Sequence, residues 1–168
     1  TEEALATEQF RMNMLMDNVP DHIYFKDKES RFFRMNKSQA ARFGLSDPAD
    51  AVGKTDFDFF TEEHARPAFE DEQKIMSTGQ PLIGLEEKET WPDGSVTWVI
   101  TTKMPLRDKD GEIIGTFGIS KDITDRKQAE KALSESQALY YSFVEHMPAA
   151  VFRKDSEGHY VFVNSYFC

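Results

Sequence analysis

Carboxylates are the side chains of this sequence that could most readily do chemistry, and they occur in two closely spaced groups. Asp56 and Asp58 are separated by a single residue, and Glu86, Glu87 and Glu89 lie within one predicted strand. Paired carboxylates can act as a general acid and a general base in hydrolysis. Solvated surface charge is nevertheless the simpler interpretation of both groups. The sequence also lacks a nucleophile elbow, a phosphate-binding loop and a metal triad, so we expect that this chain is not itself an enzyme.

The histidines and the cysteine limit the cofactors that the chain could bind. Haem iron usually takes a histidine ligand. His64 is the candidate for that role, although a histidine near the start of an acidic helix is more simply solvated. Cys168 is the single cysteine and the last residue, which excludes an internal disulfide, a multi-cysteine metal site and a thiol-linked chromophore within the domain. No His, Asp and Glu set has metal-ligand spacing, so we expect no metal and leave the cofactor unassigned.

Composition and charge are typical of a soluble globular protein. Of the 168 residues, 39% are hydrophobic and 30% are charged, and the formal net charge is −10. Phosphate binding needs clustered Lys and Arg, so nucleic acid is not an expected partner. No apolar run approaches the roughly 20 residues that span a bilayer, and we expect a cytoplasmic fragment without membrane contact. Because the chain begins at a threonine, we expect it to be part of a longer protein.

An internal repeat organises the chain. VPDHIYFKDKESRFFRMN, residues 19–36, aligns without gaps on MPAAVFRKDSEGHYVFVN, residues 147–164, at an offset of 128 positions. A fixed period of this kind indicates a repeated structural unit. We therefore expect a helix, a domain, a second helix and then the start of a second domain. The identical pairs are Pro20 and Pro148, Lys26 and Lys154, Asp27 and Asp155, Glu29 and Glu157, and Asn36 and Asn164.

The repeat extends upstream into two helical segments. Residues spaced alternately by three and four form a seam along each segment, which is the pattern of a helix that pairs with another helix. Both segments are therefore candidate coiled-coil surfaces, although each helix could instead pack on its own domain. The first seam is Leu5, Glu8, Met12, Leu15 and Val19, and the second is Leu133, Ser136, Tyr140, Phe143 and Met147.

The first part of the repeat predicts a helix followed by a hairpin. Residues 3–17 are expected to be helical, and residues 22–36 to form two short strands around the charged turn Asp27–Ser30. Alternation along the second strand places Phe33 and Met35 on one side, and we expect this pair to face the core.

Capping residues mark the helices that follow. Asn36 and Gln39 have the spacing of a capping box, in which each side chain accepts a backbone N–H. Thr61 is expected to cap a longer helix that ends at Gly79. Pro67 lies inside that helix and predicts a kink or a second helix that begins there.

Three longer strands complete the pattern, at about residues 82–91, 96–106 and 113–119. Together with the first two they predict an α+β fold, in which helices cover one face of a five-stranded antiparallel sheet.

These elements, in this order, resemble a PAS domain, also called a PAS/PAC sensory box. The motifs that carry the resemblance are NKSQAARFG (residues 36–44), WPDGSVTW (91–98) and GTFGISKDITDRKQAE (115–130). The resemblance implies an N-terminal helix at 1–17, a PAS domain at 18–124, a linker helix at 125–146 and the truncated start of a second PAS domain at 147–168. A lone hairpin is marginal in water, so we expect this tail to be disordered or held by a neighbouring chain.

The family implies a role in signalling. PAS domains occur in bacterial sensor histidine kinases of two-component systems, diguanylate cyclases and chemoreceptors. They commonly form dimers through flanking helices and carry signals from a pocket to an output domain. The resemblance therefore implies a sensory and homodimerising module, with any kinase or cyclase activity in parts of the protein outside this chain.

The junction between the last strand and the linker helix is the expected path of the signal. Asp122, Ile123 and Thr124 match the Asp-Ile-Thr motif of the family, and no glycine lies between Ile119 and Leu133. Thr124 is expected to cap the helix, and Asp122 to pair with a neighbouring basic group. A stiff connection would pass a small strand movement into the helix.

A small-molecule pocket is expected between the sheet and the helices. Aromatic residues favour a ligand site but fill an ordinary core equally well. The function predicted is therefore a ligand-binding sensor, with a ligand-free relay and dimerisation domain as the alternative, and a haem sensor or catalytic domain as weaker ones. The candidate lining residues are Phe33, Met35, Phe57, Phe60, Phe69, Ile100 and Phe117.

Overall fold

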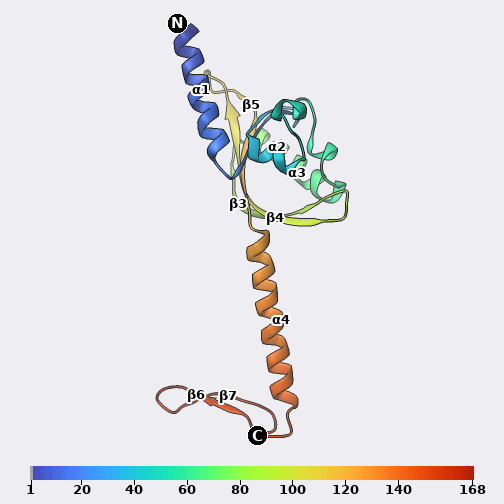
Figure 1. Cartoon of the computed structure of the whole chain (residues 1–168), viewed down its shortest axis with the longest axis vertical. Coiled ribbons are helices and arrows are strands. Elements are labelled where there is room, and N and C mark those ends of the chain that lie inside the picture. Colours follow the sequence, from blue (N-terminus) through green and yellow to red (C-terminus); the bar gives the residue numbers. More distant parts are fainter. Residues whose placement is uncertain (1) are drawn as a thin grey trace. The chain divides into compact units, whose positions relative to one another are not determined.

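A computed structural model describes residues 2–168, which divide into two compact units between Thr124 and Asp125 (Figure 1). Within these residues, none of the helices combines the length and apolarity that crossing a lipid bilayer requires. The elements of the first unit are α1 (Glu2–Asn18), β1 (His22–Asp27), β2 (Phe32–Met35), α2 (Lys37–Arg42), the 3-10 helices η1 (Pro48–Ala51) and η2 (Asp56–Asp58), α3 (Glu62–Thr78), β3 (Leu82–Thr90), β4 (Val96–Arg107) and β5 (Ile113–Asp122).

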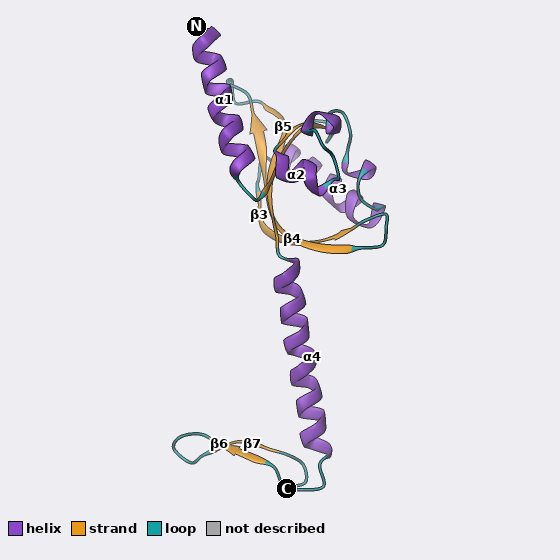
Figure 2. Ribbon diagram, in the orientation of Figure 1, coloured by secondary structure: helices purple, strands orange, loops and turns teal. Residues whose placement is uncertain are grey.

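The first unit is built on one antiparallel sheet in the order β2-β1-β5-β4-β3. The helices α2 and α3 cover one face of it (Figure 2). The chain enters the sheet with β1, forms one edge with β2, crosses through the helices to the other edge at β3 and returns to the centre with β5. This arrangement confirms the α+β fold predicted from the sequence.

The face of the sheet that packs against the helices is unusually polar. His22, Tyr24 and Lys26 alternate with partly exposed residues along β1 and are all buried. Thr101 and Lys103 on β4 are buried in the same way, as are Thr116 and Ser120 on β5. On the other face of the sheet, the partly exposed Phe25 stacks on Phe117 with ring centroids 5.8 Å apart.

A β-bulge changes which residues of β2 face the core. Arg34 lies opposite Phe25 and Phe32 lies opposite Lys26, so Phe33 is an extra residue in the ladder. The extra residue turns Phe32 and Met35 inward and leaves Phe33 exposed. The expectation that Phe33 and Met35 face the core as a pair is therefore wrong for Phe33.

Two glycines let β5 approach β1 closely. A Cβ atom at Gly115 would lie 2.0 Å from the carbonyl oxygen of Lys26. A Cβ atom at Gly118 would lie 2.3 Å from the ring of Tyr24, which crosses β5 at this point. Glycine is needed here for space, because any side chain would displace the inward residues of β1.

The caps of the helices follow the sequence only in part. The Asn36 side chain accepts the Gln39 N–H at 3.0 Å, which confirms Asn36 as the cap of α2. The other half of the predicted capping box is wrong, because the Asn36 N–H donates to the Ile23 carbonyl at 2.9 Å. The Thr61 hydroxyl does not cap α3 but bonds the Thr90 hydroxyl on β3. The helix α3 runs through Pro67 as one element, without the second helix considered at that residue.

The second unit consists of the helix α4 (Thr124–His146), which begins at the end of the first unit, and a hairpin of β6 (Phe152–Lys154) and β7 (Tyr160–Val163). The Asn164 side chain donates hydrogen bonds to Val144 near the end of α4 and to Ala149, and so holds the hairpin to the helix within this chain.

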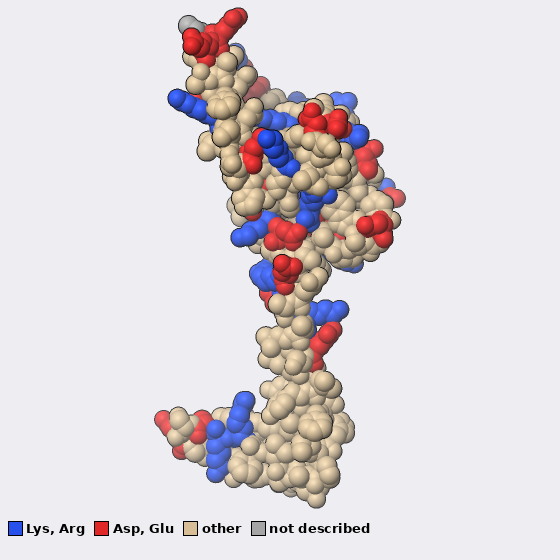
Figure 3. All heavy atoms as spheres, viewed as in Figure 1, with Lys and Arg blue, Asp and Glu red and all other residues tan. Residues whose placement is uncertain are grey.

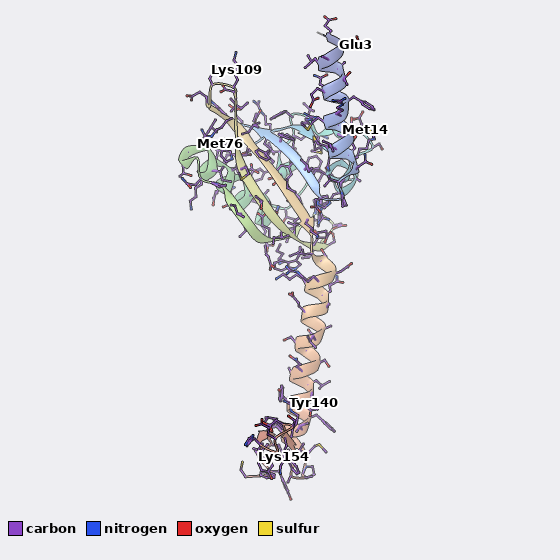
Figure 4. All side chains as sticks on the ribbon, turned by 90° about the vertical axis from the view of Figure 1, so that its left-hand side faces the viewer. Glu3, Met14, Met76, Lys109, Tyr140 and Lys154 are labelled. Atoms are coloured by element: carbon purple, nitrogen blue, oxygen red, sulfur yellow. The ribbon has the colours of Figure 1, made fainter. Side chains whose placement is uncertain are left out.

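The two helical seams expose apolar side chains. Leu15 on α1 and Phe143 on α4 are two-thirds exposed, and Tyr140 on α4, labelled in Figure 4, is about half exposed. Met14, next to Leu15 on α1 and also labelled there, lies outside the seam and is about half exposed. Over the first unit, basic side chains are interspersed with acidic ones on the face seen in Figure 3.

Candidate functional site

A small cavity lies between the polar face of the sheet and the helices. Its volume is about 20 Å³, which is room for about one water molecule. Its aromatic lining comes from Tyr24, Phe32, Phe43 and Phe60, and its charged lining from Asp56, Glu87, Glu89 and Lys103. A cavity with this lining offers aromatic faces and carboxylate oxygens to whatever occupies it.

Beside the cavity, Lys26 is completely buried between two carboxylates. Its Nζ lies 2.6 Å from Asp56 Oδ2 and 2.6 Å from Glu72 Oε1, and 4.6 Å from the centre of the Phe32 ring. Burial lowers the pKa of Lys26, but Asp56 and Glu72 raise it by more, so the ammonium group stays charged. Burial raises the pKa of Glu72, which shares its cation with Asp56. The second carboxylate oxygen of Glu72 has no hydrogen-bond partner among the described residues.

A second buried lysine forms part of the cavity wall. Lys103 Nζ lies 3.2 Å from Glu87 Oε1 and 3.9 Å from Asp71 Oδ2. Three carboxylates that the sequence suggested were solvated therefore point inward, and each is paired with a cation. They are Asp56, Glu87 and Glu89. Of the two carboxylate groups noted in the sequence, only Asp58 and Glu86 are exposed. Four largely buried carboxylates, including Glu72, face the cations Lys26, Lys103 and Arg42.

Arg42 on α2 connects the cavity wall to the end of the sheet. Its guanidinium group forms an ion pair with Glu89 on β3 and donates to Asp122 Oδ2 at 2.7 Å. It also lies 5.6 Å from the centre of the Trp91 ring. His22 on β1 has a pKa that is lowered to about 4 by burial and by the positive charge of Arg42.

The junction between β5 and α4 is hydrogen-bonded on both sides of Ile123. Asp122 Oδ1 accepts the Thr124 N–H at 2.8 Å, and the Thr124 hydroxyl accepts the Trp98 N–H at 2.9 Å. Ile123 is buried and its N–H donates to the Trp98 carbonyl at 2.9 Å. Asp122 thus accepts the first N–H of α4, and the Thr124 hydroxyl bonds the backbone of Trp98 on β4. Burial raises the pKa of Asp122, but hydrogen bonds from Thr124 and Arg42 lower it by more.

The predicted lining residues lie in different places. Phe60 lines the cavity, and Met35 is buried beside it in a core cluster with Tyr24 and Phe32. Ile100 and Phe117 alternate with inward residues of β4 and β5 and lie on the other face of the sheet. The remaining three, each more than a third exposed, are Phe33, Phe57 and Phe69.

His64 also borders the cavity, although the sequence favoured a solvated position. Its ring packs on Phe60 with centroids 4.4 Å apart, and its Nδ1 lies 3.1 Å from the Lys88 carbonyl oxygen. Among the described residues, no three His, Cys, Asp or Glu side chains are arranged to hold a metal ion.

Known proteins share this architecture. The PAS fold family model matches residues 16–128. The methanogenesis regulatory histidine kinase FilI of Methanothrix harundinacea is 33% identical over 150 residues, which cover 84% of this chain and 16% of FilI. This chain therefore spans about a sixth of that relative.

Solved structures agree with this result. VqmA bound to DPO is 28% identical, with a TM-score of 0.60 over 67% of this chain and 57% of the other. The PAS domain of BvgS from Bordetella pertussis is 27% identical, with a TM-score of 0.57 over 79% of this chain and 98% of that domain. The family match spans more than half of the chain and includes every strand of the five-stranded sheet. This chain belongs to the PAS fold family.

Proposed function

We propose that this chain is the sensory and dimerising module of a cytoplasmic signalling protein whose output domain is a histidine kinase or a diguanylate cyclase. The observation that carries the proposal is the linkage Glu89–Arg42–Asp122, which joins the cavity wall to the strand–helix junction. A molecule that enters the cavity would compete for Glu89 and shift Arg42. Arg42 would then move Asp122, and with it the first residues of α4.

The ligand that suits the cavity is small and donates hydrogen bonds, or carries a positive charge. The lysines and Arg42 are already paired with carboxylates, while carboxylate oxygens and aromatic faces remain to receive a donor or a cation. The structure of VqmA bound to DPO supports ligand binding in this fold. Any ligand larger than a water molecule requires lining side chains to move, because the cavity holds about 20 Å³.

The cavity volume favours a second candidate, a ligand-free relay. In that case side chains fill the interior, and the module receives its signal through α1 from an upstream domain. The exposed apolar seams of α1 and α4 support homodimerisation in both cases.

Mass spectrometry under native conditions should separate these two candidates. We expect protein purified from its host to carry an added small-molecule mass that is lost on denaturation. Glu89→Gln should reduce the occupancy, because it removes a charged acceptor of the cavity, whereas Glu86→Gln on the exposed side of β3 should not. An absorption spectrum identifies haem or flavin. Wild-type protein with no added mass would contradict the ligand proposal and favour the relay.

The junction makes a prediction of its own. One residue inserted after Thr124 rotates the rest of α4 by about 100°, and we expect the full-length protein to lose about fivefold or more of its signal-dependent output. A seven-residue insertion restores the helical phase to within about 20° and should restore output. The control is one residue inserted after Lys109, in the exposed β4–β5 turn. Fluorescence of Trp91 and Trp98 checks that the domain stays folded, and unchanged output after the first insertion would contradict the proposal.

A further inference from the structure

A fully buried asparagine fixes the end of α1 to the hairpin that follows it. Asn36 Nδ2 donates to the carbonyl oxygens of Met16 and Asp21, both at 2.9 Å. Its Oδ1 accepts the Ile23 N–H at 3.0 Å, and its own N–H donates to the Ile23 carbonyl at 2.9 Å. One side chain thus binds the last turn of the helix, the connection and the first strand.

Asn164 makes the same bonds in the second unit. Its Nδ2 donates to the carbonyl oxygens of Val144 and Ala149, both at 2.9 Å. Its Oδ1 accepts the Val151 N–H at 2.9 Å, and its own N–H donates to the Val151 carbonyl at 3.0 Å. Each partner lies 128 residues after its counterpart around Asn36, and both asparagines are 0% exposed.

The likeness extends to the rest of both junctions. Asp27 Oδ1 accepts two N–H groups of its turn, and Asp155 Oδ1 does the same in the second hairpin. Carboxylates near the helix ends, Asp17 and Glu145, accept the N–H of the residue after each asparagine. The second hairpin therefore repeats the local structure of the first and not only its sequence.

We propose that Asn164 is a positioning residue that makes α4 the first helix of a second PAS-like unit, because it fixes the end of α4 to the hairpin that follows. The carbonyl groups at the end of a helix have no partner within the helix. Asn164 supplies one of them with a donor and simultaneously binds Val151, the residue before β6, which couples a rotation of α4 to the hairpin. Asparagine suits this role because its amide donates two hydrogen bonds and accepts others.

The test compares the two asparagines in the full 168-residue chain. In a Cys168→Ser background, spin labels at Ser136 and Glu157 report the second junction, and labels at Glu8 and Glu29 report the equivalent positions of the first. All four sites are exposed. We expect Asn164→Ala to broaden the 136–157 distance distribution and leave the 8–29 distribution narrow, and Asn36→Ala to do the reverse.

Asn164→Asp separates positioning from a general structural role. An aspartate keeps the acceptor for the Val151 N–H but loses both donors. Amide exchange at Val151 should therefore stay close to wild type in Asn164→Asp and rise about tenfold or more in Asn164→Ala, while both variants broaden the 136–157 distances. A 136–157 distribution that stays narrow in both variants would overturn the proposal. A narrow distribution in Asn164→Asp alone would also overturn it, because the donors to Val144 and Ala149 would then not hold the helix.

Discussion

Replacing Lys26 with methionine is expected to lower the unfolding free energy of the first unit by about 3–5 kcal/mol at neutral pH. Methionine fills similar space, but it leaves the carboxylates of Asp56 and Glu72 buried without a cation. The side chains of Lys26 and Glu72 are each 1% exposed, so water cannot screen the repulsion between the two acids. Urea titration followed by fluorescence of Trp91 and Trp98 measures the loss, because both tryptophans lie in this unit.

The control is Lys28→Met, which changes an exposed lysine of the adjacent turn and should alter stability by less than about 0.5 kcal/mol. Glu72→Gln should cost far less than Lys26→Met, because Lys26 keeps Asp56 as its partner. If Lys26→Met and Lys28→Met have equal stability, the buried cluster described here is wrong.

The pH dependence of the cluster has a definite sign. The pKa of Glu72 is raised in the folded protein, so the folded state binds a proton more tightly than the unfolded chain does. The unfolding free energy should therefore decrease as the pH rises from the ordinary pKa of a glutamate to the raised one. Removing Lys26 raises the pKa of Glu72 further. Acidification should thus recover part of the stability that Lys26→Met loses, and Glu72→Gln should remove this slope.

The fold was predictable because its signals are local. Alternating strands, turn residues and the Asn36 cap depend on neighbours within a few positions, and the 128-residue repeat shows where the first hairpin begins again. The strand–helix junction was predictable for the same reason. Its hydrogen bonds were not, because Thr124 bonds Trp98 and Asp122 bonds Arg42, two partners distant in the chain that no local pattern contains.

The site was less predictable because its residues contradict the usual pattern of burial. A lysine or glutamate in an alternating strand normally marks the solvent side, whereas Lys26, Lys103 and Glu89 mark the inner side. Each is compensated by a partner distant in the chain, which no local pattern contains. Two features of the sequence hinted at the inward position of Lys26. His22, Tyr24 and Lys26 alternate along β1, and Lys26 is repeated 128 residues later as Lys154. In β2, the bulge at Phe33 breaks the alternation, so the alternating pattern placed Phe33 on the wrong side of the sheet.

Arg42→Met is expected to lower the unfolding free energy by about 3 kcal/mol, because Glu89 loses its cation inside the protein. Its second effect is on His22. Burial and the charge of Arg42 together lower the pKa of His22 to about 4, so losing the charge should raise this pKa part of the way toward 6.5. A lowered histidine pKa makes stability increase as the pH rises from about 4 to 6.5, and this slope should become shallower. NMR titration of the His22 ring measures the pKa.

Two further variants, Arg42→Lys and Asp122→Asn, separate the effect of the positive charge of Arg42 from the effect of its bridging geometry. A lysine keeps the positive charge and should hold the pKa of His22 low, but its single ammonium group cannot bridge Glu89 and Asp122 as the planar guanidinium does. Asp122→Asn keeps the buried pair and should cost less than about 1 kcal/mol, since Asp122 is 43% exposed. If the linkage transmits the signal, Arg42→Lys and Asp122→Asn should both weaken the output of the full-length protein despite their different stabilities. Output that follows stability alone would mean that Arg42 only holds the fold together.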